Sequence, residues 1–566
     1  MSDGTQPPKG PAELHGPTDA PAPLATTSPA SGGASPDLAA SPSTALPADS
    51  TGLPSAAPPP TEAAPPLAPA PPGPAVAPPV ISPPAGAAES ASAYDRFFEH
   101  ADWLSFGLTA AAALSVYLAT MGPHISLEYS GYLSTVAAYA GVPHPPGYPV
   151  WTLYSWLFTR LLPFGNVAWR VAASSAVAAA LACGLVALMV SRGGKLLGEG
   201  PARPRSGWLA DRRLARVVCG YAAGMALGLS GALWPQAVVA ETWALTTLLF
   251  AVVLCLLLRW TAAPQRRRSL YGACLAFGLV LTSNQELVVL TPAILAWVFL
   301  VDAKLGRDLA LLTAAVALGG WAAHGFGAAS WFASFTHRNW PLLVAMSLLT
   351  AAALAAIVWT GNLGSAGRPA ALCAAMVLLG LAACLYLPVA SMTNPPVNWG
   401  YPRTIDGFLH VLSRGQYEQA QPAHGLGPVL GVLWLLVTET GRRFGWLYLL
   451  FSPLPLCCLP WTAPTGRRAI LGLAGVLVCV GPLLVLTLNP AGDRASLDLV
   501  SRCFCALHVV LAVFTGLGLL ACARLIEAAR AANPAGFKAT RAGKTVAGQP
   551  SAERGKSGTR PPRTGW

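Results

Sequence analysis

The most constraining feature of this sequence is a succession of apolar runs, each about 20 residues long, which is the length that a helix needs to cross the hydrocarbon of a bilayer. Of the 566 residues, 54% are hydrophobic and only 11% are charged. A soluble globular domain has roughly a quarter of charged residues, so that class is excluded. The sequence predicts an all-α polytopic membrane protein with about twelve transmembrane helices. The expected spans are residues 103–122, 168–191, 215–234, 236–258, 269–283, 286–302, 308–328, 340–360, 370–390, 443–461, 469–488 and 503–524.

The distribution of Lys and Arg predicts which way these spans face, because cytoplasmic loops carry an excess of both. Loops 191–216 and 259–268 are strongly basic, and so is the C-terminal tail. Two apolar pieces, 149–162 and 427–438, are too short for a full span and are expected to lie in the membrane interface. The basic loops all fall on one side of the membrane only if 149–162 does not cross it. We therefore expect a multi-pass protein of the inner (plasma) membrane with both termini in the cytoplasm. The outer side then receives most of the unusual polar residues, in 122–148, 234–236, 284–286, 329–339, 391–426 and 489–502.

Composition divides the chain into three regions. Residues 1–92 are rich in Pro and Ala and have too few large apolar side chains to offset the entropy of ordering, so we expect a disordered tail. Residues 93–526 form the expected transmembrane domain, with large outer loops at 122–167 and 391–442. Residues 527–566 are a basic tail that is also expected to be disordered.

Several classes of chemistry find no support in the sequence. Nearly all of the twelve cysteines lie within apolar runs, and no C-x-x-C pair or histidine at zinc-binding spacing accompanies them, so no metal site is expected. There is no Gly-rich phosphate loop, which leaves nucleotide-driven chemistry unsupported. No basic stretch is interleaved with aromatic residues, so nucleic acid is not an expected partner.

The first outer loop contains a proline-rich segment, Pro143-His144-Pro145-Pro146-Gly147-Tyr148-Pro149. Proline fixes φ and excludes helix, so this segment is predicted to be a rigid extended strap; an ordinary turn between helices is the alternative. His144 within it can titrate or donate a hydrogen bond. Glu128 is the only carboxylate of the loop. Partial desolvation there would suit a general base, although Glu128 could also merely reach water.

Two further polar features interrupt apolar runs. Glu241 is expected about two turns inside the fourth span, with Gln236 five residues before it. An intramembrane carboxylate is functional or partnered by default. Asn284, Gln285 and Glu286 form a polar break between two apolar runs, for which a tight turn is the alternative explanation.

The second large outer loop combines amides with aromatic rings in residues 394–404 and 413–417, with Asn394, Asn398, Trp399 and Tyr417 among them. This mixture suits sugar binding, because an aromatic face packs on C–H groups while amides bond hydroxyls. One or two cations would be needed to hold an anionic lipid phosphate, and pairing with lipid headgroups is the alternative role for them. The main outward cations are Arg338, Arg403, Arg414 and Arg502.

In their order and spacing, these motifs resemble those of the transmembrane protein 260 family, and in particular its bacterial members. The residues that carry the resemblance are Gly141 to Pro149, Ala240-Glu241-Thr242-Trp243-Ala244-Leu245, Asn394 to Gly400 and Arg414-Gly415-Gln416-Tyr417. The resemblance implies a GT-C type, mannosyltransferase-like glycosyltransferase that takes a sugar, mannose in the eukaryotic members, from a polyprenyl phosphate. It implies transfer to a hydroxyl of an exported protein or glycan on the non-cytoplasmic face, with the catalytic carboxylate in the first outer loop.

Carried onto this chain, the resemblance makes Glu128 the expected proton acceptor. His144 and Glu241 would orient donor or acceptor, and Arg403 or Arg414 would hold the leaving phosphate. No cofactor is expected, since the polyprenyl-phosphate sugar is the donor substrate and its phosphate leaving group makes a divalent metal optional. The candidate substrate-binding residues are Tyr129, Tyr132, Pro145, Pro146, Gly147, Tyr148, Gln236, Asn284, Gln285, Asn394, Asn398, Trp399, Arg403, Arg414, Tyr417 and Arg502.

The sequence departs from the family pattern at three points. Tyr129-Ser130-Gly131-Tyr132 lacks both acids of a D-x-G-E pattern, Ser283-Asn284-Gln285 lacks the histidine of an N-H-Q pattern, and R-F-F-x-P is reduced to Arg502-Cys503-Phe504. One alternative is therefore a catalytically degenerate membrane protein that still binds lipid-linked sugar. A transporter or flippase is another, although the intramembrane polar residues cluster at one end instead of forming a path across the bilayer.

Overall fold

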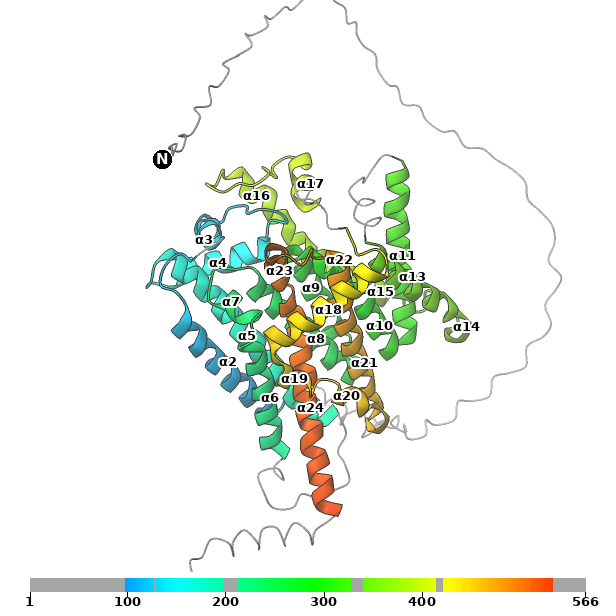
Figure 1. The fold of residues 1–566 in the computed structure, drawn as a ribbon. Helices are drawn as coiled ribbons and strands as arrows, with labels where there is room; N and C mark the ends of the chain where they lie inside the picture. The colour runs from blue at the N-terminus through cyan, green and yellow to red at the C-terminus, as the bar shows by residue number, and fades with distance from the viewer. Residues whose placement is uncertain (1–96, 127–128, 197–211, 327–338, 414–420, 533–566) are drawn as a thin grey trace, which may run out of the picture. The chain divides into compact units, whose positions relative to one another are not determined.

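The computed structural model describes residues 97–126, 129–196, 212–326, 339–413 and 421–532 (Figure 1). Within these ranges the chain is mostly helical and has no β-strand, which confirms the all-α prediction for this part of the molecule. Its one isolated bridge pairs Val142 and Asn398 in parallel. The predicted tail 1–92 and residues 533–566 of the predicted C-terminal tail lie outside the described ranges.

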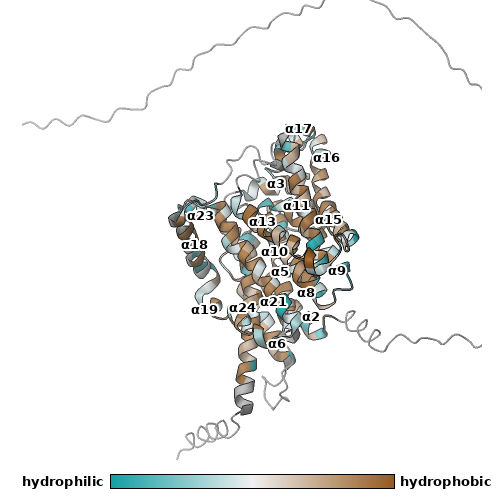
Figure 2. Ribbon diagram, turned by 90° about the vertical axis from the view of Figure 1, so that its right-hand side faces the viewer, coloured by the Kyte–Doolittle hydropathy of each residue, from teal (hydrophilic) through white to brown (hydrophobic). Residues whose placement is uncertain are grey.

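Seven helical segments of the described chain are long and apolar enough to cross a membrane, which indicates a multi-pass membrane protein. Figure 2 shows hydrophobic residues along most of the long helices. Two further apolar segments, Arg268–Ser283 and Gln285–Val301, are shorter. The expected number of about twelve spans is therefore not confirmed. The seven segments are His100–Thr120, Val167–Gly194, Trp243–Ala262, Trp340–Thr360, Gly367–Met392, Pro464–Leu488 and Phe504–Ile526.

Helix α5 (Val167–Leu196) is the centre of the N-terminal half. It contacts α2 (His100–Thr120), α4 (Pro149–Leu161), α6 (Arg212–Gly228) and α8 (Trp243–Ala262). Many of its buried side chains are alanines and serines, which allow neighbouring helices to approach closely.

The contact between α5 and α6 shows how close this approach is. A Cβ atom placed on Gly224 of α6 would lie 2.6 Å from the carbonyl oxygen of Cys183 in α5. It would also lie 2.5 Å from Cγ2 of Thr109 in α2. Only glycine fits at this position, and such small residues let helix backbones pack in a membrane protein without a large hydrophobic driving force between them.

A buried charge network joins α2, α5 and α6 at the ends where α2 and α6 begin. The Asp102 carboxylate is fully buried and accepts hydrogen bonds of 2.5 Å from both Arg216 Nη2 and Ser191 Oγ. The Arg216 guanidinium also bonds the Ser191 carbonyl at 2.7 Å and pairs with Glu99 at 3.1 Å. Because removing one partner would leave a buried charge uncompensated, the network holds these three helices in one arrangement.

The rest of the described chain forms helices of very unequal length. They are α3 (Ser130–Tyr139), α9 (Arg268–Ser283), η1 (Gln285–Leu290), α10 (Thr291–Val301), α11 (Ala303–Gly325), α13 (Trp340–Ala355), α14 (Ile357–Thr360), α15 (Gly367–Leu381), η2 (Ala382–Leu385), α16 (Tyr386–Met392), α17 (Ile405–Ser413), α18 (Leu426–Thr440), α21 (Pro464–Val478), η5 (Cys479–Leu483), α22 (Leu484–Leu488), α23 (Arg494–Ser501) and α24 (Phe504–Ala532).

Residues 443–461, predicted as one span, do not form a continuous helix. The chain passes through a π-helical turn and three short pieces there. Gly445 has a φ of +99°, and prolines at 453, 455 and 460 remove backbone donors. The prediction of a single span was wrong because the mean hydropathy of a segment does not show where glycine and proline interrupt the helix. The pieces are η3 (Gly441–Gly445), α19 (Trp446–Leu449), α20 (Leu454–Cys457) and η4 (Leu459–Trp461).

Several of the short elements lie at one end of the long helices. Figure 1 shows α3, α4, α16, α17 and α23 toward this end, whereas the C-terminal end of α24 lies at the other. Helix α4 exposes Leu153, Leu157 and Leu161 and buries Thr152 and Ser155. An apolar outer face of this kind suits contact with lipid, as the sequence predicts for residues 149–162.

Candidate functional site

The strap, residues 143–149, is buried except at His144, which is partly exposed. Gly147 has a φ of +90°, which residues with a side chain rarely adopt. A Cβ atom there would also lie 2.7 Å from Cδ2 of Leu387 in α16. Residues 143–148 thus pack against α16 without forming a helix, and α4 begins at Pro149. Gly147 donates its N–H to the His144 carbonyl at 3.0 Å, so this segment contains the turn given as the alternative to the predicted extended strap.

Backbone hydrogen bonds fasten the strap to the second large loop. Val142, directly before the strap, donates its N–H to the carbonyl of Val397 at 2.9 Å and accepts from the N–H of Trp399 at 3.0 Å. The hydroxyl of Tyr386 in α16 also donates a hydrogen bond to the carbonyl of Ala140, two residues before Val142. The two loops that carry many of the predicted site residues are therefore joined directly.

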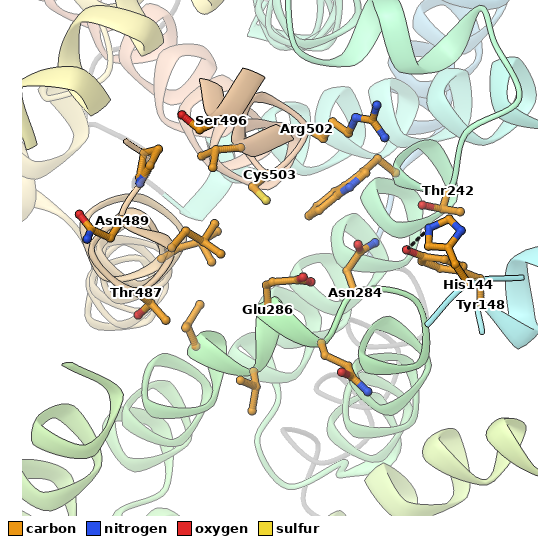
Figure 3. A pocket seen from close by; sticks show the side chains of 18 of the residues that line it. His144, Tyr148, Thr242, Asn284, Glu286, Thr487, Asn489, Ser496, Arg502 and Cys503 are labelled. Atoms are coloured by element: carbon orange, nitrogen blue, oxygen red, sulfur yellow. Dashed lines mark hydrogen bonds between the residues drawn. The ribbon is translucent and has the colours of Figure 1, made fainter. Parts of the chain in front are cut away.

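His144 lies in a cluster of three tyrosines. Its ring centroid is 5.6 Å from that of Tyr129, 5.7 Å from Tyr132 and 5.2 Å from Tyr148. The Tyr132 hydroxyl accepts a hydrogen bond of 2.8 Å from the backbone N–H of His144. The Tyr148 hydroxyl and His144 Nε2 form a hydrogen bond of 3.3 Å, which is drawn in Figure 3. Both backbone and ring of His144 are thereby oriented.

Glu241 lies in the connection between α7 (Leu233–Ala237) and α8, and not two turns inside a span as predicted. Its carbonyl accepts hydrogen bonds from Trp151 Nε1 at 3.0 Å and from Ser175 Oγ at 3.2 Å. The Glu241 backbone N–H donates a hydrogen bond to the same Ser175 hydroxyl at 3.2 Å. Helices α4 and α5 thus fix the Glu241 backbone just before α8 begins, where the helix dipole favours a carboxylate.

Arg502 pairs with Glu241 from the other end of the chain. Its Nη1 lies 3.5 Å from Glu241 Oε2, and the two side chains are 20% and 9% exposed. Arg502 is the C-cap residue of α23, and only Cys503 separates it from the start of α24. A guanidinium presents five N–H donors in a planar fork, the geometry that binds phosphate or carboxylate oxygens.

In the polar break at 284–286, Asn284 joins α9 to η1, and Gln285 and Glu286 are the first two residues of η1. The Asn284 Nδ2 donates to Thr246 Oγ1 at 2.6 Å, and the Gln285 Nε2 donates to the carbonyl of Leu412 at 2.8 Å. Glu286 follows in the first turn of η1 and is half-buried. The break therefore anchors η1 to its neighbours and also presents a carboxylate.

These groups line one pocket of about 530 Å³ (Figure 3). Its walls come from the strap, the α7–α8 connection, η1, the start of α13 and the stretch from α22 to α24. A cation, two carboxylates, amides and aromatic rings within a largely apolar lining suit a ligand with an anionic and a hydroxylated part. The predicted site residues that line the pocket are Tyr129, His144, Tyr148, Glu241, Asn284, Gln285 and Arg502.

Other predicted residues of the first loop and α7 lie outside this pocket. Tyr132, Pro145, Pro146 and Gly147 belong to the strap and its support, as described above. Gln236 lies on α7, and its Oε1 is buried with no hydrogen-bond partner in the described part of the chain.

Four predicted residues of the second large loop that the structure describes, Asn394, Asn398, Trp399 and Arg403, also lie outside the pocket. Asn398 Nδ2 donates to the carbonyl of Ser391 at 3.1 Å, and Trp399 meets Tyr132 edge-on with ring centroids 6.4 Å apart. Arg403 is exposed and donates to Asn394 Oδ1 at 3.1 Å.

Three predicted site residues, and one predicted outward cation, lie outside the described residues, so their relation to the pocket stays a prediction. They are Glu128, Arg414, Tyr417 and Arg338.

The pocket also contains residues that the sequence predictions did not select. Thr242, Trp243 and Glu286 directly follow selected residues, and this adjacency was the signal that could have found them. The others carry no such signal, because only the fold brings their segments together. They include Asn339, Thr487, Asn489, Ser496 and Cys503.

No three His, Cys, Asp or Glu side chains stand together as possible metal ligands within the described ranges. Among the described pocket residues, the Asp, Glu, Lys and Arg side chains are the ion pair of Glu241 with Arg502 and the carboxylate of Glu286.

Residues 130–307 match the family model of the protein O-mannosyl-transferase TMEM260 N-terminal domain. This part of the chain is similar to that domain. It contains the strap, Glu241 and the 284–286 turn, whereas Arg502 and the second large loop come after it.

Curated relatives match over a part of their length. Protein O-mannosyl-transferase TMEM260 of Mus musculus is 29% identical over 191 residues, which are 33% of this chain and 24% of the mouse protein. Protein O-mannosyl-transferase tmem260 of Dictyostelium discoideum is 34% identical over 77 residues, 13% of this chain and 9% of that protein. The chain thus spans a quarter or less of the length of these relatives. No solved structure matches the chain significantly.

Proposed function

We propose that this chain is a GT-C type membrane glycosyltransferase, a bacterial relative of the proteins named above. It moves a sugar from a polyprenyl phosphate to a hydroxyl of an exported protein or glycan. The observation that carries the proposal is the pocket in which Arg502, Glu241 and His144 come together. The match of residues 130–307 to a domain named for a protein O-mannosyl-transferase supports it, and makes mannose the first sugar to test.

Arg502 binds the donor phosphate in this proposal. As the bond between sugar and phosphate breaks, negative charge grows on the phosphate, and preorganised N–H donors in a water-poor pocket stabilise it. Glu241 orients the guanidinium from 3.5 Å away. Arg403, one of the cations predicted for this role, is tied to Asn394 on an exposed loop, so Arg502 is the better-placed candidate.

The strap and the 284–286 turn contact the sugar. Asn284 and Gln285 line the pocket and use their NH₂ groups on Thr246 and Leu412, so their carbonyl oxygens are the atoms that can accept hydrogen bonds from sugar hydroxyls. The rings of His144 and its tyrosines offer faces for sugar C–H groups. The resemblance gives the role of proton acceptor to Glu128, which directly precedes the pocket residue Tyr129 in the sequence and lies outside the described residues.

The positions of α8 and α9 support the proposed sidedness. Glu241 and Trp243 lie where α8 begins, and Asn284 lies where α9 ends, so the pocket adjoins these two helix ends. The basic loop 259–268 joins their opposite ends. Since basic loops stay in the cytoplasm, the pocket faces the non-cytoplasmic side of the inner membrane, and both termini are cytoplasmic.

The proposal is tested with the purified full chain in lipid nanodiscs. The probe is polyprenyl phosphate carrying labelled mannose or glucose, with hydroxyl-bearing peptides as acceptors, and the readout is label on peptide or released to water. Wild type is expected to turn over the donor. Arg502→Gln is expected to lower the rate by about 10²–10³-fold. The matched control is Arg468→Gln, an exposed arginine of α21 outside the pocket, which should leave the rate unchanged.

The alternatives give different results in the same experiment. A protein that binds the sugar lipid but neither transfers nor hydrolyses its sugar would be the degenerate binding protein. Movement of the lipid between the leaflets of reconstituted vesicles, without turnover, would identify a flippase. Either outcome contradicts the proposed transferase.

A further inference from the structure

Two carboxylates line the pocket among its described residues, and the roles above use one of them. Glu241 pairs with Arg502 at 3.5 Å, and α4 and α5 hold its backbone. A carboxylate that takes a proton gives up such a pairing and leaves the guanidinium uncompensated. Glu241 is therefore suited to holding Arg502 and poorly suited to accepting a proton during the reaction.

Glu286 lines the pocket at the start of η1, next to two amide side chains whose hydrogen bonds fix this part of the backbone. Asn284 donates to Thr246 and Gln285 to the carbonyl of Leu412, so these two pocket-lining side chains also tie the start of η1 to its neighbours. Glu286 follows as the second residue of η1, and Figure 3 shows its carboxylate pointing toward the middle of the pocket.

The surroundings of Glu286 suit a group that handles a proton away from bulk water. The side chain is half-buried, and Val288, Val289 and Leu342 line the same pocket. Figure 3 shows Glu286 and Arg502 projecting from different walls. A donor with its phosphate on Arg502 would place its sugar between these walls, with room for an acceptor hydroxyl on the side of Glu286.

We infer that Glu286 is a catalytic carboxylate, which takes the proton of the acceptor hydroxyl. The hydroxyl oxygen forms a bond to the anomeric carbon as its proton passes to Glu286. The bond from that carbon to the phosphate oxygen breaks, and its electron pair leaves with the phosphate on Arg502. This single displacement inverts the anomeric carbon. The inference rests on the proposed function and assigns to Glu286 the step that the resemblance gives to Glu128.

The decisive variant is Glu286→Gln, which keeps the shape of the side chain and cannot take the proton. Transfer of labelled mannose is expected to slow by about 10²–10⁴-fold, the usual contribution of a general base. Binding of sugar-free polyprenyl phosphate, measured by titration in nanodiscs, is expected to stay within about threefold of wild type. Added formate is expected to restore part of the transfer rate in Glu286→Ala, because a small carboxylate then fills the vacated position.

The matched control is Asp498→Asn, which removes one carboxylate from α23 outside the pocket. The Asp498 side chain is 67% exposed, and the transfer rate should not change. Glu128→Gln is run in parallel. Transfer that survives in Glu286→Gln and is lost in Glu128→Gln would overturn this inference alone.

Two further outcomes would also overturn it. If Glu286→Gln loses transfer and lipid binding together, and formate restores nothing in Glu286→Ala, the residue shapes the pocket and takes no proton. If the wild-type chain turns over no lipid-linked sugar, the proposed function fails and the assignment of Glu286 falls with it.

Discussion

Arg502 Nη1 and Glu241 Oε2 lie 3.5 Å apart, although the two residues are distant in the sequence. The start of α24 is held against the turn before α7, where Cys505 Sγ donates to the carbonyl of Ala232 at 3.4 Å. This contact brings the α23–α24 junction to the α7–α8 connection, and the ion pair closes between them. The pocket is thus built jointly by the part of the chain that resembles the O-mannosyl-transferase domain and by the C-terminal part that follows it.

The ion pair predicts non-additive effects on lipid binding. Arg502→Gln should weaken binding of sugar-free polyprenyl phosphate by about tenfold or more, because a charge-assisted contact contributes roughly 1.5–3 kcal/mol. Glu241→Gln should weaken it less. The double variant should match Arg502→Gln, since Glu241 acts through Arg502. Titration in nanodiscs measures all three, and fully additive losses would show that the two residues act separately.

Replacing Tyr132 should lower activity, because its hydroxyl holds His144 in position. Tyr132→Phe removes the acceptor of the 2.8 Å hydrogen bond from the His144 backbone N–H. An unpaired buried donor costs about 1–3 kcal/mol, so the strap should shift, and the turnover number should fall about tenfold. The Michaelis constant for the donor should change less. Tyr139→Phe, at a side chain that is 61% exposed, is the control and should match wild type.

Gly147 predicts a loss of stability. Gly147→Ala combines a φ of +90° with a contact of 2.7 Å to Leu387, and such strain costs about 1–3 kcal/mol. Thermal unfolding in detergent, followed by tryptophan fluorescence, should occur a few degrees lower. The control is Gly427→Ala in α18, where no atom lies within 4 Å of the new Cβ. An unchanged unfolding temperature in Gly147→Ala would contradict the close packing of the strap on α16.

Replacing Asp102, in the buried charge network where α2 and α6 begin, should lower stability more than Gly147→Ala does. Asp102→Asn removes the fully buried counter-ion of Arg216 and leaves only the partly exposed Glu99 of this network, and breaking a buried pair costs about 3–5 kcal/mol. The same fluorescence assay should show a drop in unfolding temperature greater than that of Gly147→Ala. Asp406→Asn on α17 removes an exposed carboxylate and should be nearly neutral. Equal effects of the two Asp variants would mean that the buried network adds little.

The apolar runs predicted much of the helical structure. Spans expected from residues 103, 168 and 503 correspond to helices that begin at His100, Val167 and Phe504. This works because a backbone in hydrocarbon must satisfy its own hydrogen bonds, and a helix does so within one segment. The method failed at 443–461, where glycine and proline interrupt an apolar run.

The sequence by itself determined several of the long apolar helices and that residues 143–148 are non-helical, because both follow from local chemistry. Only the tertiary structure decided that Glu241 meets Arg502, and that Glu286 faces the pocket while Gln236 and Asn398 do not. These side-chain positions depend on how whole helices pack, and close helix contacts such as that of Gly224 with Cys183 determine that packing. Contacts between distant segments leave no periodic signal in a single sequence, so the folded chain alone defines the pocket.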